Sequence, residues 1–373
     1  MDFLSSIMSQ MNNLYYFRKL FPPKLMARNA ITMPLDYISP GGYARPPMAI
    51  NILATARCNL DCEMCSMAPL RKRRFKEMSP QDIEGIAKQV ATYGTSFFIG
   101  GGEPFARRDI IDVFRAIKKY NLPLGTVSNA TLVTPQKARE VVDAGVDSIM
   151  FSLHGPREVH DRLTRIPGSF DKAIKNIRYF CEHKGNTDVM MNLVLSRENI
   201  ENIFEMIELG RSLGVDKVRV EHLLFMTDRE LDYHVRWTGQ HLSLQDSSVK
   251  EVNTYVCRPE TFTTIPKGLY ELLQEIHKRY GKFVFIKPHL SKEEIDRWYS
   301  EGYISNRRCF FLWRSLFIDP QGDVFPCQTY SKMVIGNVLQ EPLLELWNSP
   351  RFRSMRRELR KGLLPACARC CKI

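Results

Sequence analysis

The stretch that decides the fold reads Met48-Ala-Ile-Asn-Ile-Leu-Ala-Thr-Ala-Arg-Cys58-Asn-Leu-Asp-Cys62-Glu-Met-Cys65. An apolar run of strand length leads directly into a loop that carries three cysteines. Structural zinc takes four protein ligands, usually from paired cysteine knuckles, whereas three thiolates on a 4Fe–4S cluster leave one iron free for another ligand. The spacing therefore favours an iron–sulfur site at the end of the first strand. Zinc with a distant fourth ligand and a coincidence of buried cysteines are the alternatives.

The chain around this loop alternates between short β-rich runs and amphipathic helical stretches. Strands are expected at residues 48–54, 96–100, 124–128, 148–153, 189–195 and 217–222, with helices at residues 80–93, 110–120, 135–144, 170–183 and 200–213. Strands that alternate with helices of this length predict right-handed βαβ units and a parallel sheet. Six units predict an α/β fold, an open (β/α)6 version of the eight-unit TIM barrel, in which the active site lies at the C-terminal ends of the strands.

The cysteine loop resembles the signature of the radical S-adenosylmethionine (SAM) superfamily, C-x3-C-x-φ-C, where φ is aromatic or apolar. The resemblance implies that Cys58, Cys62 and Cys65 hold a 4Fe–4S cluster whose open iron is chelated by the amino and carboxylate groups of SAM. Met64 fills the φ position, which implies that it helps to place the adenine. An electron from the reduced cluster would break the sulfonium bond, and the resulting 5′-deoxyadenosyl radical would remove hydrogen from an unactivated carbon.

Further positions match the same family. The second strand ends in Gly100-Gly101-Gly102-Glu103-Pro104, which matches the family's GGEP motif. Glycines let the backbone approach a ligand closely, and the resemblance implies that Glu103 pairs with the SAM ammonium.

The next strand ends carry the remaining SAM-binding candidates. Ser128, Asn129 and Ser152 suit the ribose hydroxyls and the methionine carboxylate. Arg165 resembles the arginine that meets the SAM carboxylate, because a guanidinium pairs well with that group, and Asn192 is a weaker candidate of the same kind. His154 is a candidate proton donor, with a structural histidine at a strand end as the alternative.

Half of the ten cysteines lie in the last part of the chain, near an expected β-hairpin around residues 320–323 and a helix at residues 343–362. By geometry alone, zinc and a second iron–sulfur cluster both fit four thiolates there. The arrangement resembles the SPASM/Twitch extension of the superfamily, which implies an auxiliary 4Fe–4S cluster. The proposed ligands are Cys309, Cys327, Cys367 and Cys370, with Cys371 as the alternative to Cys370.

The number of cysteines decides how many clusters are expected. Cys181, on a helix of the barrel, and Cys257, in an irregular segment, are expected to be core thiols. The remaining cysteines are too few for two fully ligated auxiliary clusters, which indicates one cluster of the Twitch type.

The chain is expected to divide into four parts: an N-terminal arm (1–46), the barrel (47–225), a linker or excursion over the barrel mouth (226–305) and the auxiliary-cluster module (306–373). The arm is expected to start as a short amphipathic helix and to become irregular after Pro22-Pro23. It either packs on the barrel or contacts a membrane surface or lipid substrate, since basic residues without acids lie among its aromatics.

Composition narrows the class of protein. The 373 residues are 44% hydrophobic and 25% charged, which excludes collagen-like, coiled-coil and wholly disordered chains. No apolar run approaches the length of a spanning helix, and residues 1–17 do not resemble a signal peptide. A cytoplasmic enzyme is therefore expected, peripheral to a membrane at most, in which reduced cysteines serve as metal ligands or core thiols.

The net charge of +12 favours an anionic partner. Basic runs at residues 71–76 and 351–361 are expected to be solvated faces. As the alternative, the run at residues 71–76 follows the cluster loop closely enough to line the mouth and bind phosphate, a sugar nucleotide or an acidic head group. Contact with an acidic flavodoxin or ferredoxin as electron donor is a further alternative. Nucleic acid is disfavoured because no recognised binding module accompanies the charge.

The expected substrate is a small polar or phosphorylated metabolite, such as a sugar or cyclitol, with net oxidation through the auxiliary cluster. A lipid intermediate and a peptide are the alternatives. A non-catalytic zinc or iron–sulfur protein is the alternative of another class.

Overall fold

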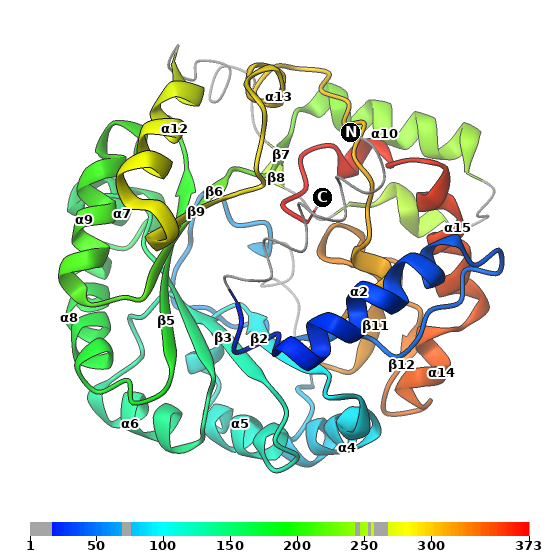
Figure 1. The fold of residues 1–373 in the computed structure, drawn as a ribbon, viewed down its shortest axis with the longest axis horizontal. Helices are drawn as coiled ribbons and strands as arrows, with labels where there is room; N and C mark the ends of the chain where they lie inside the picture. Colours follow the sequence, from blue (N-terminus) through cyan, green and yellow to red (C-terminus); the bar gives the residue numbers. More distant parts are fainter. Residues whose placement is uncertain (1–16, 69–75, 243–246, 253–254, 257–267, 373) are drawn as a thin grey trace.

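The computed structural model describes residues 17–68, 76–242, 247–252, 255–256 and 268–372, and it shows the expected open barrel with helices on its outside (Figure 1). Six strands pair in chain order and in parallel: β1 (Ala49–Thr55), β2 (Ser96–Gly101), β3 (Leu124–Ser128), β4 (Ser148–Ser152), β5 (Asp188–Leu195) and β6 (Lys217–His222). The helices that follow them are α4 (Pro80–Val90), α5 (Ile110–Lys118), α6 (Pro135–Asp143), α7 (Arg157–Thr164), α8 (Ser169–Glu182) and α9 (Ile203–Leu213). Both faces of the strands are largely buried, as is typical of parallel sheets covered by helices.

Local sequence sets the helix starts. Ser79 accepts a hydrogen bond from the Asp82 amide and Thr134 accepts one from the Lys137 amide. In both helices a proline occupies the first turn, where its missing N–H is not needed. These caps position the helices that line up against the strands.

The sheet continues beyond the six predicted strands at both ends. At one end β10 (Ser315–Ile318) pairs in parallel with β1, and β11 (Asp323–Phe325) and β12 (Gly336–Asn337) follow in antiparallel order. At the other end β9 (Val284–Lys287) pairs in parallel with β6. The hairpin of the expected module and part of the expected excursion therefore belong to the same sheet as the barrel, covering edges that would otherwise expose unpaired backbone. The four-part division of the chain stays a prediction.

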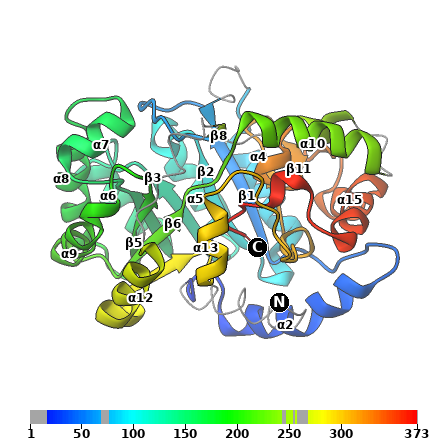
Figure 2. The same ribbon diagram turned by 90° about the horizontal axis from the view of Figure 1, so that it is seen from above.

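The expectation of one helix at residues 343–362 is wrong in one respect. The segment forms two helices, α14 (Leu343–Trp347) and α15 (Pro350–Lys361). Ser349 caps the second by accepting a hydrogen bond from the Phe352 amide, and Pro350 cannot continue a helix from its N-terminal side. Between the barrel and this region lie α10 (Asp228–His241), the short strands β7 (Phe225–Met226) and β8 (Tyr255–Val256), α12 (Leu269–Tyr280) and α13 (Lys292–Trp298) (Figure 2).

The arm contains a helix, α2 (Pro23–Ile38), where an irregular segment was expected after Pro22-Pro23. That expectation is wrong because the two prolines start the helix rather than end it. The helix expected within the first 17 residues lies outside the described part of the chain. No helix among the described residues is long and apolar enough to span a bilayer.

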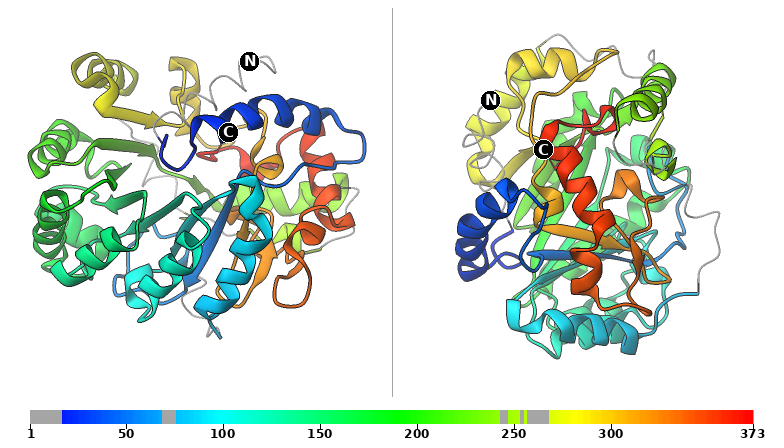
Figure 3. Two further views of the ribbon diagram at one scale, coloured as in Figure 1. Left: turned by 60° about the horizontal axis from the view of Figure 1, so that its bottom comes forward. Right: turned by 90° about the vertical axis from the view of Figure 1, so that its right-hand side faces the viewer.

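The arm closes the barrel at the N-terminal ends of the strands, so it does pack on the main domain (Figure 3). Ser96, at the start of β2, donates a hydrogen bond to the Leu20 carbonyl, and Lys19 Nζ lies 2.8 Å from Asp188 Oδ1 at the start of β5. Gly125 makes room for the Leu20 side chain, because a Cβ there would lie 2.7 Å from Leu20 Cδ1.

Candidate active site

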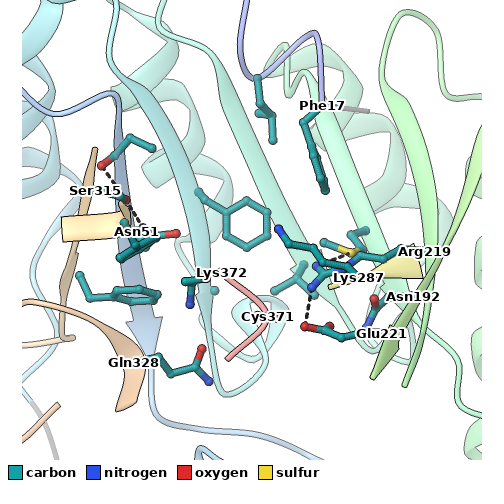
Figure 4. Close-up of a pocket in the computed structure, with 18 of the residues that line it drawn as sticks. Phe17, Asn51, Asn192, Arg219, Glu221, Lys287, Ser315, Gln328, Cys371 and Lys372 are labelled. Carbon is teal, nitrogen blue, oxygen red and sulfur yellow. Dashed lines mark hydrogen bonds and ion pairs between the residues drawn. The ribbon is translucent and has the colours of Figure 1, made fainter. Parts of the chain in front are cut away.

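A cavity of about 460 Å³ lies inside the barrel (Figure 4). Its walls come from the cysteine loop, the inner face of the sheet, the C-terminal residues and the part of the arm just before α2. Most of the wall is apolar, with Phe98, Val127, Met150, Phe311 and Phe317 among its residues. A smaller polar region contains Asn192, Arg219, Glu221 and Lys287, and Lys372 lies apart from it, over the rings of Phe311 and Phe317.

The three loop cysteines Cys58, Cys62 and Cys65 are half-buried. The loop is held against the end of α7, because the Asp61 amide donates to the Thr164 carbonyl at 3.1 Å. The Leu60 amide lies 3.4 Å from Cys58 Sγ, which places a donor next to a sulfur. Amide donors of this kind stabilise the negative charge of a metal-bound thiolate.

Gly101 and Gly102 are required by the packing of two loops. The Gly102 amide donates to the Thr55 carbonyl at 2.8 Å, and a Cβ on Gly102 would lie 2.2 Å from the Arg57 carbonyl oxygen. Gly101 has a φ of +125°, which favours glycine. The glycine turn thus fixes the backbone just before Cys58. Gly101 also lines the cavity together with Met64, the positions where SAM is expected.

Glu103 is buried at the end of β2 and is held by three donors. Its carboxylate accepts hydrogen bonds from Ser128 Oγ at 2.8 Å, from the Asn129 amide at 2.7 Å and from the Phe105 amide at 3.1 Å. Burial raises the pKa of Glu103 to about 7, although these hydrogen bonds oppose the rise. The carboxylate therefore ties the β2 turn, which continues through Pro104, to the end of β3. Pairing with the SAM ammonium stays a prediction.

Two further SAM-binding candidates face the cavity or the cysteine loop. Asn192 lies beside Ser152 in the pairing of β4 and β5, and its buried Oδ1 has no hydrogen-bond partner among the described residues. Arg165, at the end of α7, is exposed with Nη1 3.7 Å from Asp61 Oδ2 of the loop. A buried acceptor that lines a cavity is suited to a donor from a ligand.

His154 is buried just after β4. Burial, with a smaller effect of His160, lowers the pKa of His154 to about 3, so its ring is neutral at physiological pH. The Val194 amide donates to its Nδ1 at 3.4 Å. Its role as a proton donor stays a prediction.

The C-terminal cysteines are more deeply placed than the loop cysteines. Cys309 and Cys367 are buried, and burial together with the nearby Cys327 raises the pKa of Cys309 to about 11. The same causes raise the pKa of Cys367, whose Sγ lies 3.7 Å from the Tyr330 hydroxyl. Cys370 is close enough to Tyr330 to contribute to the raised pKa of that phenol.

Cys371 lies in a different environment from Cys370, its neighbour in the sequence. It lines the cavity beside Glu221 and Lys287, and a hydrogen bond with Cys370, together with burial, raises the pKa of Cys371 to about 12. This arrangement favours Cys370 as the fourth ligand of an auxiliary cluster. Cys181 is half-buried on α8, and burial raises the pKa of its thiol, whereas Cys257 lies outside the described residues.

Within the described ranges, no three His, Cys, Asp or Glu side chains are close enough to hold a single metal ion. A cubane binds each thiolate through a different iron, so its ligand sulfurs lie further apart than the ligands of one ion. Two groups of thiols fit that all-thiolate chemistry: the half-buried loop cysteines beside a cavity, and a C-terminal group in which Cys309 and Cys367 are buried and Cys327 and Cys370 are half-buried.

The charged residues of the cavity were not singled out from the sequence: Arg219, Glu221, Lys287, Arg314 and Lys372. Arg219 and Glu221 point inward from β6, with Arg219 Nη2 2.5 Å from Glu221 Oε1, and Lys287 ends β9. Burial raises the pKa of Glu221 to about 7, and burial with the nearby Arg219 lowers the pKa of Lys287 to about 8. The alternation of charged and apolar residues in Lys217–His222 was the available signal, because it places alternate side chains on one face. Nothing in the pattern indicated that β9 lies next to β6.

Two family patterns match this chain. The Radical SAM superfamily matches residues 52–210, and the SPASM iron–sulfur cluster-binding domain matches residues 309–371. The chain belongs to the radical SAM superfamily and to its SPASM/Twitch subgroup. It is therefore a radical SAM enzyme, and it uses SAM and 4Fe–4S clusters. When bound, these groups supply the 5′-deoxyadenosyl radical that removes a hydrogen atom from a substrate.

Known relatives are similar over most of this radical SAM enzyme. The AdoMet-dependent heme synthase of Methanosarcina barkeri is 26% identical over 314 residues, covering 81% of this chain and 82% of the relative. A probable GTP 3′,8-cyclase of Saccharolobus islandicus is 28% identical over 256 residues, 65% of this chain and 78% of the relative.

Solved structures share the fold. SuiB of Streptococcus suis, bound to its precursor peptide SuiA, superposes with a TM-score of 0.62 at 18% identity, covering 89% of this chain and 70% of SuiB. The AdoMet-bound enzyme anSMEcpe gives a TM-score of 0.57 at 17% identity, over 84% of this chain and 82% of its own.

Proposed function

We propose that this radical SAM enzyme removes a hydrogen atom from a small anionic molecule held in the barrel cavity. The resulting carbon radical would lose an electron to the auxiliary cluster and a proton to solvent or a base, which makes the net reaction an oxidation. The observation that carries the proposal is the excess of cations in the cavity, where the one carboxylate, Glu221, is accompanied by Arg219, Lys287, Arg314 and Lys372.

The proposed cofactor ligands follow from the site. Cys58, Cys62 and Cys65 would hold the SAM-binding cluster beside the cavity, and Met64, Gly101 and Asn192 would contact SAM. Glu103 would keep Ser128 and Asn129 in place at the adjoining strand end. Arg165 would reach the SAM carboxylate from the end of α7. The auxiliary cluster would be held by Cys309, Cys327, Cys367 and Cys370.

The cation-rich region suits a phosphate or carboxylate. Arg219 Nε is buried and has no hydrogen-bond partner among the described residues, so it can donate to a ligand. A guanidinium and an ammonium in a low-dielectric cavity favour an anion, and Glu221 offsets only part of their charge. The heme synthase and GTP cyclase named above have a small molecule in their names, which supports a small-molecule substrate over a peptide.

A lipid intermediate is the second candidate, and one observation favours it. The apolar walls continue from the cysteine loop to Phe17 and Leu20 of the arm, so the cavity can hold an apolar body as well as an anionic end. A sugar or cyclitol would use few of these apolar contacts. We further propose that an acidic flavodoxin or ferredoxin donates electrons to the enzyme and that the arm contacts a membrane.

The proposal is tested by following deuterium into 5′-deoxyadenosine. The reconstituted enzyme is incubated anaerobically with SAM, reductant and a deuterated metabolite extract separated into anionic, neutral, peptide and lipid fractions. Label is expected from an anionic fraction, which includes acidic lipids. Arg219→Leu should lower label transfer roughly 10- to 100-fold while SAM cleavage without substrate continues, because a charged hydrogen bond is lost.

Arg178→Leu is the matched control, because Arg178 is exposed on the outside of the barrel. It should transfer label like the unchanged enzyme. Label that comes only from neutral compounds or peptides, or label transfer that Arg219→Leu does not change, would contradict an anionic substrate in this cavity.

A further inference from the structure

The outer face of α2 carries an apolar stripe. Ile31, Leu35 and Ile38 are 69%, 50% and 62% exposed, and Tyr43 beyond the helix is 52% exposed. The opposite face of α2, including Leu25, Met33 and Tyr37, is buried, and the Tyr37 ring packs against Phe310 and Trp313. Of the nine large apolar side chains that are exposed in the described part of the chain, these four lie together in one segment of 13 residues. Contiguous exposed apolar surface of this kind marks an interaction site.

Basic side chains of α15 border this stripe. The Arg353 guanidinium lies 3.8 Å from the centre of the Tyr43 ring, and Arg360 Nη1 donates to the Ser39 carbonyl at 2.5 Å. Arg357 is exposed, with Nη1 3.4 Å from the Gly41 carbonyl. Figure 3 shows α15 beside the C-terminal end of α2. These partners are neutral carbonyls and a ring, so the positive charge of the three arginines is retained.

Acidic groups are scarce on this side of the arm. Residues 17–46 contain one acid, Asp36, which is buried and pairs with Arg45 at 2.6 Å. The surface made by Ile31, Leu35, Ile38, Tyr43, Arg353, Arg357 and Arg360, here called the arm face, is therefore apolar in its centre and cationic at one end. Its charge is complementary to an anionic partner.

We propose that the arm face binds the surface of an anionic lipid membrane. A convex helix face with aliphatic side chains and neighbouring arginines matches the way interfacial helices insert into the headgroup region, whereas docking a protein usually requires a complementary groove. Arginines near the surface add attraction to anionic lipids. The arm face lies at the end of the barrel where Leu20 lines the cavity, so a bound membrane would lie next to the substrate cavity. The inference stands apart from the identity of the substrate.

The test is co-sedimentation of the full chain with vesicles. Vesicles made of equal parts phosphatidylcholine and phosphatidylglycerol should bind the protein, and vesicles of phosphatidylcholine alone should bind it much more weakly. Binding should weaken with added salt, because salt screens the arginines. Ile31→Ser with Leu35→Ser should weaken binding roughly tenfold or more, since apolar surface no longer leaves water.

Matched controls distinguish binding through the arm face from nonspecific binding to vesicles. Ile304 and Leu339 are 60% and 51% exposed elsewhere, so Ile304→Ser with Leu339→Ser should leave binding unchanged. Arg357→Gln should weaken binding roughly fivefold, the effect of one cation near an anionic surface. Lys172→Gln, which removes an exposed cation on α8, should leave binding unchanged.

Three outcomes would overturn the proposal. The first is that the full chain does not bind the anionic vesicles. The second is that the Ile304/Leu339 pair weakens binding as much as the Ile31/Leu35 pair. The third is a concentration-dependent dimer, or a complex with an acidic flavodoxin, that the Ile31/Leu35 pair abolishes while vesicle binding is unaffected. That result would assign the arm face to a second copy or to an electron donor.

Discussion

Cys58, Cys62 and Cys65 are half-buried on a loop beside the cavity, whereas Cys309 and Cys367 are buried, with Cys367 beside Tyr330. The first group is reachable by a ligand that enters and leaves, as a cosubstrate must. The second group is shielded from water, and burial raises the pKa of its thiols, so free thiols there are neutral and unreactive. We therefore propose that the loop cysteines hold a cluster that is open to SAM and that the C-terminal cysteines hold a closed, auxiliary cluster.

The largest expected effect comes from the open site. Cys62→Ala should abolish 5′-deoxyadenosine formation from SAM under strong reductant, because the cluster loses one of its three proposed ligands. Formation of 5′-deoxyadenosine is measured by chromatography of anaerobic reactions. Cys181→Ala, which removes a thiol on α8 outside both groups, is the control and should retain activity. SAM cleavage by the Cys62 variant at the normal rate would refute the assignment of the loop.

A second set of variants tests which cysteines hold the auxiliary cluster. The unchanged chain should bind about eight irons, as two 4Fe–4S clusters require. Cys327→Ala and Cys370→Ala should each lose about half of the iron while reductive SAM cleavage continues. Cys371→Ala should keep the full iron content, because Cys371 faces Glu221 and the cavity. The comparison is made by iron analysis of anaerobically reconstituted protein, and an equal loss in the Cys371 variant would place that thiol on the cluster instead.

A smaller effect, on stability, is expected from a substitution of Glu103 near the cysteine loop. Glu103→Gln should destabilise the apo-protein by about 1–3 kcal/mol, because a glutamine amide cannot accept all three hydrogen bonds. The pKa of Glu103 is raised from 4.5 to about 7, so the folded protein binds a proton more tightly than the unfolded chain. The stability due to this proton is present below pH 4.5 and is lost as pH rises to about 7.

This pH dependence is checked by denaturant unfolding of both forms. The loss caused by Glu103→Gln should be largest at the acidic end of that range and should shrink toward neutral pH. A loss that does not vary with pH would show that the Glu103 carboxyl has an ordinary pKa.

The smallest expected effect concerns Asn192. Its Oδ1 has no partner among the described residues, so Asn192→Ala should leave the thermal midpoint of the apo-protein nearly unchanged. SAM affinity, measured by anaerobic equilibrium dialysis, should fall about tenfold, because the ligand loses one hydrogen bond. Unchanged affinity would remove Asn192 from the proposed SAM contacts.

The barrel was predictable because each of its elements is specified locally. Leu124–Ser128 and Lys217–His222 were expected with these bounds, and Pro80 and Pro135 start their helices as first-turn prolines. The cysteine loop and the glycine turn were found because their spacing is tied to chemistry. The prolines misled in the arm, because Pro23 begins α2 instead of ending regular structure.

The cavity was less predictable because it is made by distant pairings. Lys287 reaches Arg219 only because β9 joins β6, and Cys371 reaches Glu221 only because the C-terminus returns to the sheet. Long-range pairing leaves no periodic signal in either segment. Likewise, nothing in the sequence indicated that the neighbouring residues Cys370 and Cys371 lie in different surroundings.

The central claim is that one cluster is open to SAM and the other is closed. The direct measurement is the EPR spectrum of the anaerobically reduced enzyme before and after SAM is added, compared with the spectrum of Cys327→Ala, which retains the loop cluster. We expect SAM to change one of two overlapping signals, and to change the single signal of the variant in the same way. Spectra that do not respond to SAM, or a response that disappears with Cys327→Ala, would contradict the account.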